Sequence, residues 1–401
     1  MILALIAAGG IWGQGVWTQV ADFEGGNRSG ATGFSIGIKG YVFGGSSGSQ
    51  FHRDLWEYDA MSDDWTQKAS LPADRRRNAV SFTIDGEAYV GTGYCGGTLY
   101  CADFWKWDQV TNTWSQIASY PGEGGIGLTG CIAFSIEGKG YVGLGSGWLS
   151  GPLYSEEFWE YDTGMNAWTR LPDFPGGQRT NAVGFAMANK GYVGTGVGSS
   201  YQKDFWQYDP VDSSWKQLTN SPGQERGASV GFAIGNKAYL GTGAVTGPVT
   251  VYPDLWQCDS TVDSWAQVSD YPGGSGSGVG GGACFVIGSE AYMGIGGDET
   301  TYFKDFWRFS PDSVSGIIEA DLSEALSLWP NPASSQVWLR RSDPSPATLT
   351  VLAPEGKVII RESLNSELIA LDLASLPSGI YIVRVACGEE VRQVLLIRLS
   401  E

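Results

Sequence analysis

The sequence predicts an all-β chain built from six copies of one four-stranded unit, followed by a small C-terminal β-sandwich. The first observation is a repeat of 47 to 54 residues in which a tryptophan opens each copy, at Trp17, Trp65, Trp114, Trp168, Trp215 and Trp265. The second is the composition, because 59 glycines and 13% aromatic residues are typical of short strands and tight turns. The third is the lack of helical periodicity within the units. Six consecutive units of this length indicate a six-bladed β-propeller.

Each unit carries the same landmarks at the same spacing. A Phe and a Tyr stand seven residues apart, as Phe82 and Tyr89 do, with turn-forming residues such as Asp85-Gly86 between them. This spacing predicts a tight hairpin between strands one and two. An acidic–Phe/Leu–Trp triplet such as Asp103-Phe104-Trp105 marks strand three, and in five units a second Trp follows nine residues later. An Asp six residues before that second Trp is expected to bond the backbone of the turn between strands three and four.

The last unit is incomplete, and the N-terminus is expected to complete it. After Trp307 the chain reads Phe309-Ser310-Pro311, with no further Trp nine residues on. Trp17 supplies the missing strand from the other end of the repeat. Pairing the two ends closes the ring and leaves no free sheet edge.

These features resemble the kelch repeat, which combines glycines after strand two, an aromatic residue in strand three and a Trp in strand four. The resemblance covers residues 17 to about 310. It implies a six-bladed kelch propeller with a galactose oxidase-like fold. Copper chemistry of the galactose oxidase type needs two imidazole ligands, and His52 is the only histidine of the chain. We therefore expect no metal site and no cofactor.

The chain divides into four predicted segments. Residues 1–15 are apolar and end in small residues, which predicts a secretory signal peptide, although a basic n-region is missing. The propeller is expected to span residues 16–315 and to be followed by a linker at 316–326. Residues 327–401 are expected to form the C-terminal β-domain. No later apolar run is long enough to span a bilayer.

The C-terminal segment has three ordered motifs: Pro330-Asn331-Pro332, a Leu376-Pro377-x-Gly379-Ile380-Tyr381 segment, and a basic last strand with Arg392 and Arg398. It resembles the C-terminal sorting domain (type A) of the type IX secretion system of Bacteroidota. The resemblance implies export across the outer membrane by that machinery, followed by release or attachment at the cell surface. An unrelated β-sandwich adhesion module is the alternative.

The net charge limits the binding partners that the chain can have, and the cysteines indicate the compartment in which it works. The formal net charge of −18 repels phosphate backbones, so nucleic acid is a poor candidate partner. Cys95 and Cys101 flank a five-residue segment of one loop, where a disulfide is expected in an oxidising compartment. We expect a monomer whose partners are a ligand and the secretion machinery.

The loops between strands two and three vary in length, and so the face of the disc that carries them is the candidate binding face. Before strand one, four units place an arginine: Arg28, Arg76, Arg179 and Arg226. If these arginines line the central channel, their guanidinium groups could clamp a carboxylate. The alternative is structural: nearby Glu24, Asp74 and Glu225 neutralise them.

Two function classes remain open at the level of sequence. The first is a glycan- or protein-binding module whose loop aromatics, Trp148 and Tyr201 among them, stack on the ligand. The second is an enzyme that resembles the sialic-acid mutarotases, with Glu225 as a weak candidate for general acid–base catalysis on a carboxylated sugar. No motif forces a catalytic role.

Overall fold

The computed structural model describes residues 15–401 apart from gaps at 98, 248, 260–262, 299, 312–325, 330–335, 342–344, 353–356, 365, 367, 374–375, 378, 388–389 and 399–401. The chain forms two compact units, residues 1–315 and 316–401. The expected signal peptide at residues 1–15 lies outside the described residues except for Gly15, and the expected linker lies outside them except for Leu326. In the part of the chain that the structure describes, no helix is both long and apolar enough to cross a bilayer.

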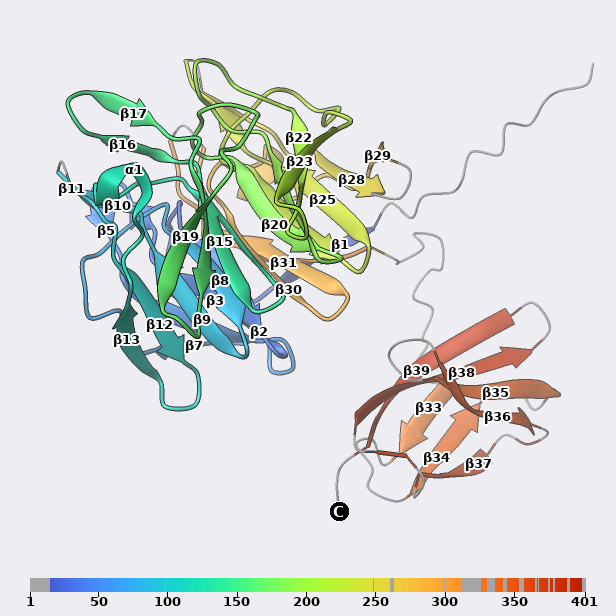
Figure 1. Ribbon diagram of the computed structural model, residues 1–401. Helices are drawn as coiled ribbons and strands as arrows, with labels where there is room; N and C mark the ends of the chain where they lie inside the picture. Colours follow the sequence, from blue (N-terminus) through green and yellow to red (C-terminus); the bar gives the residue numbers. More distant parts are fainter. Residues whose placement is uncertain are drawn as a thin grey trace, which may run out of the picture. The chain divides into compact units, whose positions relative to one another are not determined.

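The first unit contains six four-stranded antiparallel sheets, which are the six predicted blades (Figure 1). Blades one and two consist of β2 (Thr32–Ile36), β3 (Lys39–Phe43), β6 (Leu55–Asp59) and β7 (Asp64–Lys68), then β8 (Val80–Ile84), β9 (Glu87–Gly91), β12 (Phe104–Asp108) and β13 (Thr113–Ile117). Blades three and four consist of β14 (Ile132–Ile136), β15 (Lys139–Gly143), β18 (Phe158–Asp162) and β19 (Ala167–Leu171), then β20 (Val183–Met187), β21 (Lys190–Gly194), β22 (Phe205–Asp209) and β23 (Ser214–Leu218). Blades five and six consist of β24 (Val230–Ile234), β25 (Lys237–Gly241), β28 (Leu255–Asp259) and β29 (Ser264–Gln267), then β30 (Ala283–Ile287), β31 (Glu290–Gly294), β32 (Phe306–Ser310) and β1 (Val16–Val20).

The N-terminal strand closes the ring, as the sequence predicts. β1 pairs antiparallel with β32, and Trp17 stands opposite Phe309. The Trp17 ring packs on Tyr271 and Phe309, with centroids 5.3 and 4.9 Å away, and its indole N–H donates to the Ser269 carbonyl at 3.0 Å. β1, which leads into blade one, is therefore held in the sixth sheet by backbone pairing and by the contacts of the half-buried Trp17 ring.

The predicted turns also form. Asp85 and Gly86 both have positive φ angles, 52° and 79°, the backbone of a tight hairpin turn between β8 and β9. The aspartates at the ends of the third strands accept bonds from the turn backbone: Asp59 from Met61, Asp108 from Val110 and Thr111, Asp162 from Met165, and Asp209 from Val211.

Strand-two glycines permit close packing between blades. A methyl group at Gly140 of blade three would overlap the Phe82 ring of blade two. Phe82 itself stacks on Tyr89, with centroids 5.1 Å apart. In blades one, three and four, the ring of a Phe from the preceding blade packs directly on the backbone of Gly40, Gly140 and Gly191, where a Cβ atom would overlap it.

Backbone hydrogen bonds link all six blades in a closed circuit, here called the central belt. Each belt residue donates its N–H to the carbonyl of the equivalent residue in the preceding blade, over 2.7 to 3.1 Å. The belt residues are Gly30, Asn78, Gly130, Asn181, Ala228 and Gly281. All six have positive φ angles, so each points its N–H and C=O along the circuit. The belt makes every blade depend on both of its neighbours.

Short hairpins project between strands two and three, on the face with the variable loops. They are β4 (Ser46–Ser47) with β5 (Gln50–Phe51), β10 (Tyr94–Gly96) with β11 (Leu99–Tyr100), β16 (Ser146–Trp148) with β17 (Pro152–Tyr154), and β26 (Ala244–Val245) with β27 (Thr250–Val251). We call this side of the disc the hairpin face.

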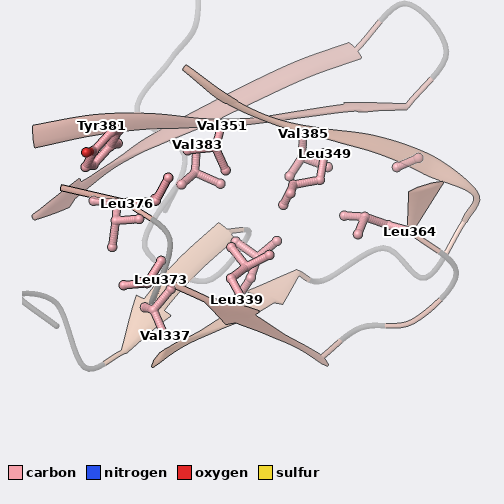
Figure 2. Packing of buried hydrophobic residues seen from close by; sticks show 13 residues of the cluster. Val337, Leu339, Leu349, Val351, Leu364, Leu373, Leu376, Tyr381, Val383 and Val385 are labelled. Atoms are coloured by element: carbon pink, nitrogen blue, oxygen red, sulfur yellow. The ribbon is translucent and has the colours of Figure 1, made fainter. Parts of the chain in front are cut away.

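The second unit is a β-sandwich. One sheet contains β33 (Leu326–Trp329), β34 (Gln336–Arg341) and β37 (Leu368–Asp372), and the other contains β36 (Val358–Leu364), β35 (Ala347–Leu352), β38 (Gly379–Cys387) and β39 (Glu390–Arg398). Figure 2 shows buried side chains of both sheets meeting between them, among them Leu339, Leu349 and Val383. This arrangement confirms the predicted C-terminal β-sandwich.

Candidate ligand-binding face

The four arginines before strand one are buried and ion-paired inside their own blades. Arg28, Arg76, Arg179 and Arg226 are each at most 1% exposed. Their partners are the acids of the Asp–Phe/Leu–Trp triplets, in the pairs Arg28–Asp54, Arg76–Asp103, Arg179–Asp204 and Arg226–Asp254. Each pair is bidentate, the strongest geometry for a guanidinium and a carboxylate.

This geometry corrects two expectations. The acids near the arginines in sequence, Glu24, Asp74 and Glu225, are exposed and are not the neutralising partners. The arginines also do not line the channel along the axis of the disc. That channel, a cavity of about 200 Å³, is lined by uncharged and mostly small residues after the belt, at 31–33, 79–81, 131–133, 182–184, 229–231 and 282–284. The structural alternative therefore describes the arginines, and their geometry does not support a carboxylate clamp.

The acidic residue of each Asp–Phe/Leu–Trp triplet also accepts a hydrogen bond from the tryptophan of the same triplet. The Asp103 carboxylate accepts from the Trp105 indole at 2.6 Å, and Asp54 accepts from Trp56 at 2.8 Å. Burial by itself raises the pKa of Asp103, but hydrogen bonds and the charge of Arg76 outweigh it, so the pKa lies below its usual value. The acid is thus ionised and saturated with donors.

Two blades lack the arginine, and a helical turn replaces it. Where Leu128 stands in blade three, the backbone N–H of Glu123 in α1 (Gly122–Gly125) donates to Glu157 at 2.8 Å. Where Val279 stands in blade six, Gly274 of the 3-10 turn η1 (Gly274–Gly276) donates to Asp305 at 3.2 Å. Both acids still accept from their tryptophans, Trp159 and Trp307. Every blade therefore keeps the acidic residue before strand three, but the group that donates hydrogen bonds to it is an arginine in four blades and a backbone N–H in blades three and six.

The hairpin face carries aromatic side chains at one repeated position. In each blade, the residue five positions after the strand-two Tyr pairs with a residue on the return arm of the hairpin, as Tyr94, which follows Tyr89, pairs with Tyr100. These return-arm residues are Phe51, Tyr100, Tyr154, Tyr201, Val251 and Tyr302, five of them aromatic and all half-buried. We call them the aromatic positions. Because the blades form a closed ring, these positions recur around the disc.

Trp148 and Tyr201, which the sequence nominates as ligand residues, differ in their surroundings. Trp148 ends β16 and is 55% exposed, and its neighbour Leu149 is 66% exposed. Tyr201 is half-buried, and its hydroxyl oxygen accepts from the Thr246 backbone at 2.9 Å and bonds the Thr246 hydroxyl at 2.8 Å. The structure thus leaves Trp148 open to solvent and ties Tyr201 to the hairpin of blade five. Glu225 is exposed beside the buried Arg226.

Two pockets lie at the same place in the repeat. The blade 3–4 pocket, of about 400 Å³, is lined by Tyr154, residues 176–179, Gly198, Ser199 and Gln202. The blade 1–2 pocket, of about 410 Å³, is lined by residues 49–51, Arg53, residues 73–75 and Cys95. Each uses one aromatic position, the connection into the next blade, and the next blade's hairpin. The sequence did not identify these pockets, because their walls come from two different repeats.

A disulfide joins Cys95 and Cys101, whose Cα atoms are 6.1 Å apart. It spans the β10–β11 hairpin, and Cys95 lines the blade 1–2 pocket. Among the described residues, no group of three or more His, Cys, Asp or Glu side chains is placed to hold a metal ion.

The comparisons with known proteins agree with this architecture. A model described as "Kelch motif" matches residues 28–72, and one described as "Secretion system C-terminal sorting domain" matches residues 327–397. The solved structure of YjhT is similar with a TM-score of 0.61 and 14% identity, over 71% of this chain and 95% of that one, a likeness that shows the fold alone. The comparison with curated proteins finds no match. The chain is therefore a kelch-type β-propeller followed by a C-terminal sorting domain of the type IX secretion system, which directs it to the cell surface or the surrounding medium.

Proposed function

We propose that the propeller is a glycan-binding module and that the hairpin face is its binding surface. The observation that carries this proposal is the set of half-exposed aromatic residues at five of the six aromatic positions. An aromatic ring offers a rigid apolar face for the C–H face of a sugar at low entropic cost. Nothing in the scaffold demands an aromatic here, since Val251 occupies the same position in blade five.

The blade 3–4 pocket has the composition that a sugar needs. Tyr154 supplies a ring, while Gln178, Ser199 and Gln202 supply amide and hydroxyl groups that both donate and accept hydrogen bonds. Exposed Trp148 stands on the same β16–β17 hairpin as Tyr154 and extends the apolar surface. A few polar groups around an aromatic wall are typical of small-ligand sites. Separate pockets that recur around a disc suit a polymer with repeating units.

Other ligand classes have less support. A protein partner of standard size buries about 800 Å² on each side, whereas the pockets of the hairpin face are separate hollows of about 400 Å³. The mutarotase-like alternative relies on free arginines near Glu225, and Arg179 and Arg226 are occupied by Asp204 and Asp254.

A glycan array probed with the purified full-length protein tests this function. We expect binding to a defined glycan group and about a tenfold loss of affinity for Tyr154→Ala or Trp148→Ala, equivalent to about 1.4 kcal/mol. Met165→Ala is the matched control, because Met165 is an apolar side chain, 69% exposed, in the turn between strands three and four on the opposite face. An array without glycan hits, or an equal loss in the Met165→Ala control, would contradict the proposal.

A further inference from the structure

The two equivalent pockets differ in charge. Because Arg76 and Arg179 occupy the same position of the repeat, Arg75 corresponds to Gln178 and Arg77 corresponds to Thr180. Phe51 and Tyr154 correspond as the aromatic positions. The blade 1–2 pocket thus has the same framework as the blade 3–4 pocket, with Arg75 in its lining in place of the neutral Gln178, and Arg77 beside it in place of Thr180.

Arg77 is held in place without an acidic partner. Its backbone exchanges two hydrogen bonds with Tyr94, at 3.1 and 2.9 Å. Its guanidinium carbon lies 5.3 Å from the centroid of the Tyr94 ring and 5.6 Å from that of Phe51. Its Nε atom is buried without a hydrogen-bond partner, and no ion pair is found for it among the described residues. Stacking on two rings orders a guanidinium and leaves its N–H edge free.

Two other arginines, Arg53 and Arg75, line the pocket itself, whereas Arg77 lies beside it, stacked on the lining residue Phe51. Arg53 and Arg75 are exposed, and Arg53 donates only to the Ala73 carbonyl, at 3.2 Å. The opposing charge in the lining is Asp74, which is also exposed. Two cationic side chains of the lining, with Arg77 stacked on Phe51 beside them, therefore stand against one carboxylate in a chain whose net charge is −18. A local reversal of sign beside a cavity concentrates anions from solution.

We propose that the blade 1–2 pocket binds a carboxylate-bearing sugar residue, so that the hairpin face recognises an acidic glycan. This inference rests on the proposed glycan-binding function. The sugar ring packs on Phe51, and its carboxylate receives hydrogen bonds from Arg75 and Arg77, the geometry for which guanidinium groups are best suited. The Cys95–Cys101 disulfide holds the hairpin that carries Tyr94, so less ordering is required when the ligand binds.

Calorimetry with trigalacturonate, galactotriose and acetate tests the inference on the full-length protein. We expect trigalacturonate to bind at least about tenfold more tightly than galactotriose, and acetate alone to bind only weakly. The double variant Arg75→Gln with Arg77→Thr gives these two positions the residues of blade four, Gln178 and Thr180. It should remove the preference for the acidic sugar. Lys216→Met, on the exposed strand β23 of blade four, removes a positive charge elsewhere and should keep the preference.

Stability is controlled by thermal melts, since neither replaced arginine contributes an ion pair in the described structure. If the double variant melts early, Arg75→Gln alone provides the same comparison. Equal affinity for the two trisaccharides, or an unchanged preference in the arginine variants, would overturn the inference. If an array still shows neutral glycans bound through Tyr154, the glycan-binding function survives and only the acidic subsite is wrong.

Discussion

The guanidinium of Arg76 and the carboxylate of Asp103 form a two-point ion pair inside blade two, with donor–acceptor distances of 2.9 and 2.8 Å. Arg76 also donates to the Thr92 carbonyl at 3.2 Å, and Asp103 also accepts from Trp105. One buried pair thus ties the connection before β8, the loop after β9 and the start of β12. The same arrangement recurs in blades one, four and five.

Replacing Arg76 by Met should strongly destabilise the propeller. The substitution keeps most of the side-chain volume but leaves the Asp103 carboxylate without its partner, which costs about 3–5 kcal/mol for a buried pair. Lys106→Met is the control, because Lys106 and Glu87 are each about one-third exposed and such pairs contribute less than about 1 kcal/mol. Urea unfolding measures both. An unchanged midpoint for Arg76→Met would show that the pair does not stabilise the fold.

The same pairs predict acid sensitivity. Burial raises the pKa values of Asp54, Asp103 and Asp254, but their arginine and tryptophan donors lower them further, so each lies below its ordinary value. A depressed folded-state pKa contributes stability that is complete above the unfolded value, about 3.9, and is lost as the pH falls through the folded value. Melting temperatures should therefore fall steeply below about pH 4. Arg76→Met should weaken this dependence, and a parallel pH profile for the variant would contradict the assignment.

Ring closure should depend on Trp17. Trp17→Ala removes the ring that packs on Tyr271 and Phe309, and we expect a loss of about 3 kcal/mol. Trp148→Ala is the matched control, because that side chain is 55% exposed and its loss should cost less than about 0.5 kcal/mol. Thermal melts compare the two variants. If both melt like the parent protein, β1 is not needed to hold the ring closed.

The C-terminal sandwich should direct export without supporting the propeller. Truncation after residue 320 removes the segment that matches the sorting domain, 327–397, and leaves all six blades. In a host with the type IX machinery, the truncated chain should accumulate in the periplasm in a folded form. Cell fractionation and protease accessibility measure its location. Surface display of the truncated chain at the level of the full-length protein would contradict the sorting role.

The sequence determined the blades, because each landmark answers a local requirement. A tight hairpin needs residues such as Asp85-Gly86 that accept positive φ, and close approach of a neighbouring ring needs a glycine such as Gly140. Because these requirements recur at the same spacing in every blade, comparing the six repeats with one another reveals the blades in the sequence. The incomplete last unit and the isolated Trp17 then predicted the closing strand, which the pairing of β1 with β32 confirms.

Only the tertiary structure decided the partners of the arginines and the composition of the pockets. Arg76 pairs with an acid 27 positions away, while Asp74, two positions before it, is exposed, because the hairpin of β9 and β12 brings distant loops together. In the run Arg75-Arg76-Arg77, the middle side chain is buried and its neighbours lie outside the ion pair, a difference that composition does not reveal. Each pocket wall combines two repeats, and the blades come into register only when the belt and the closing strand hold them around one axis.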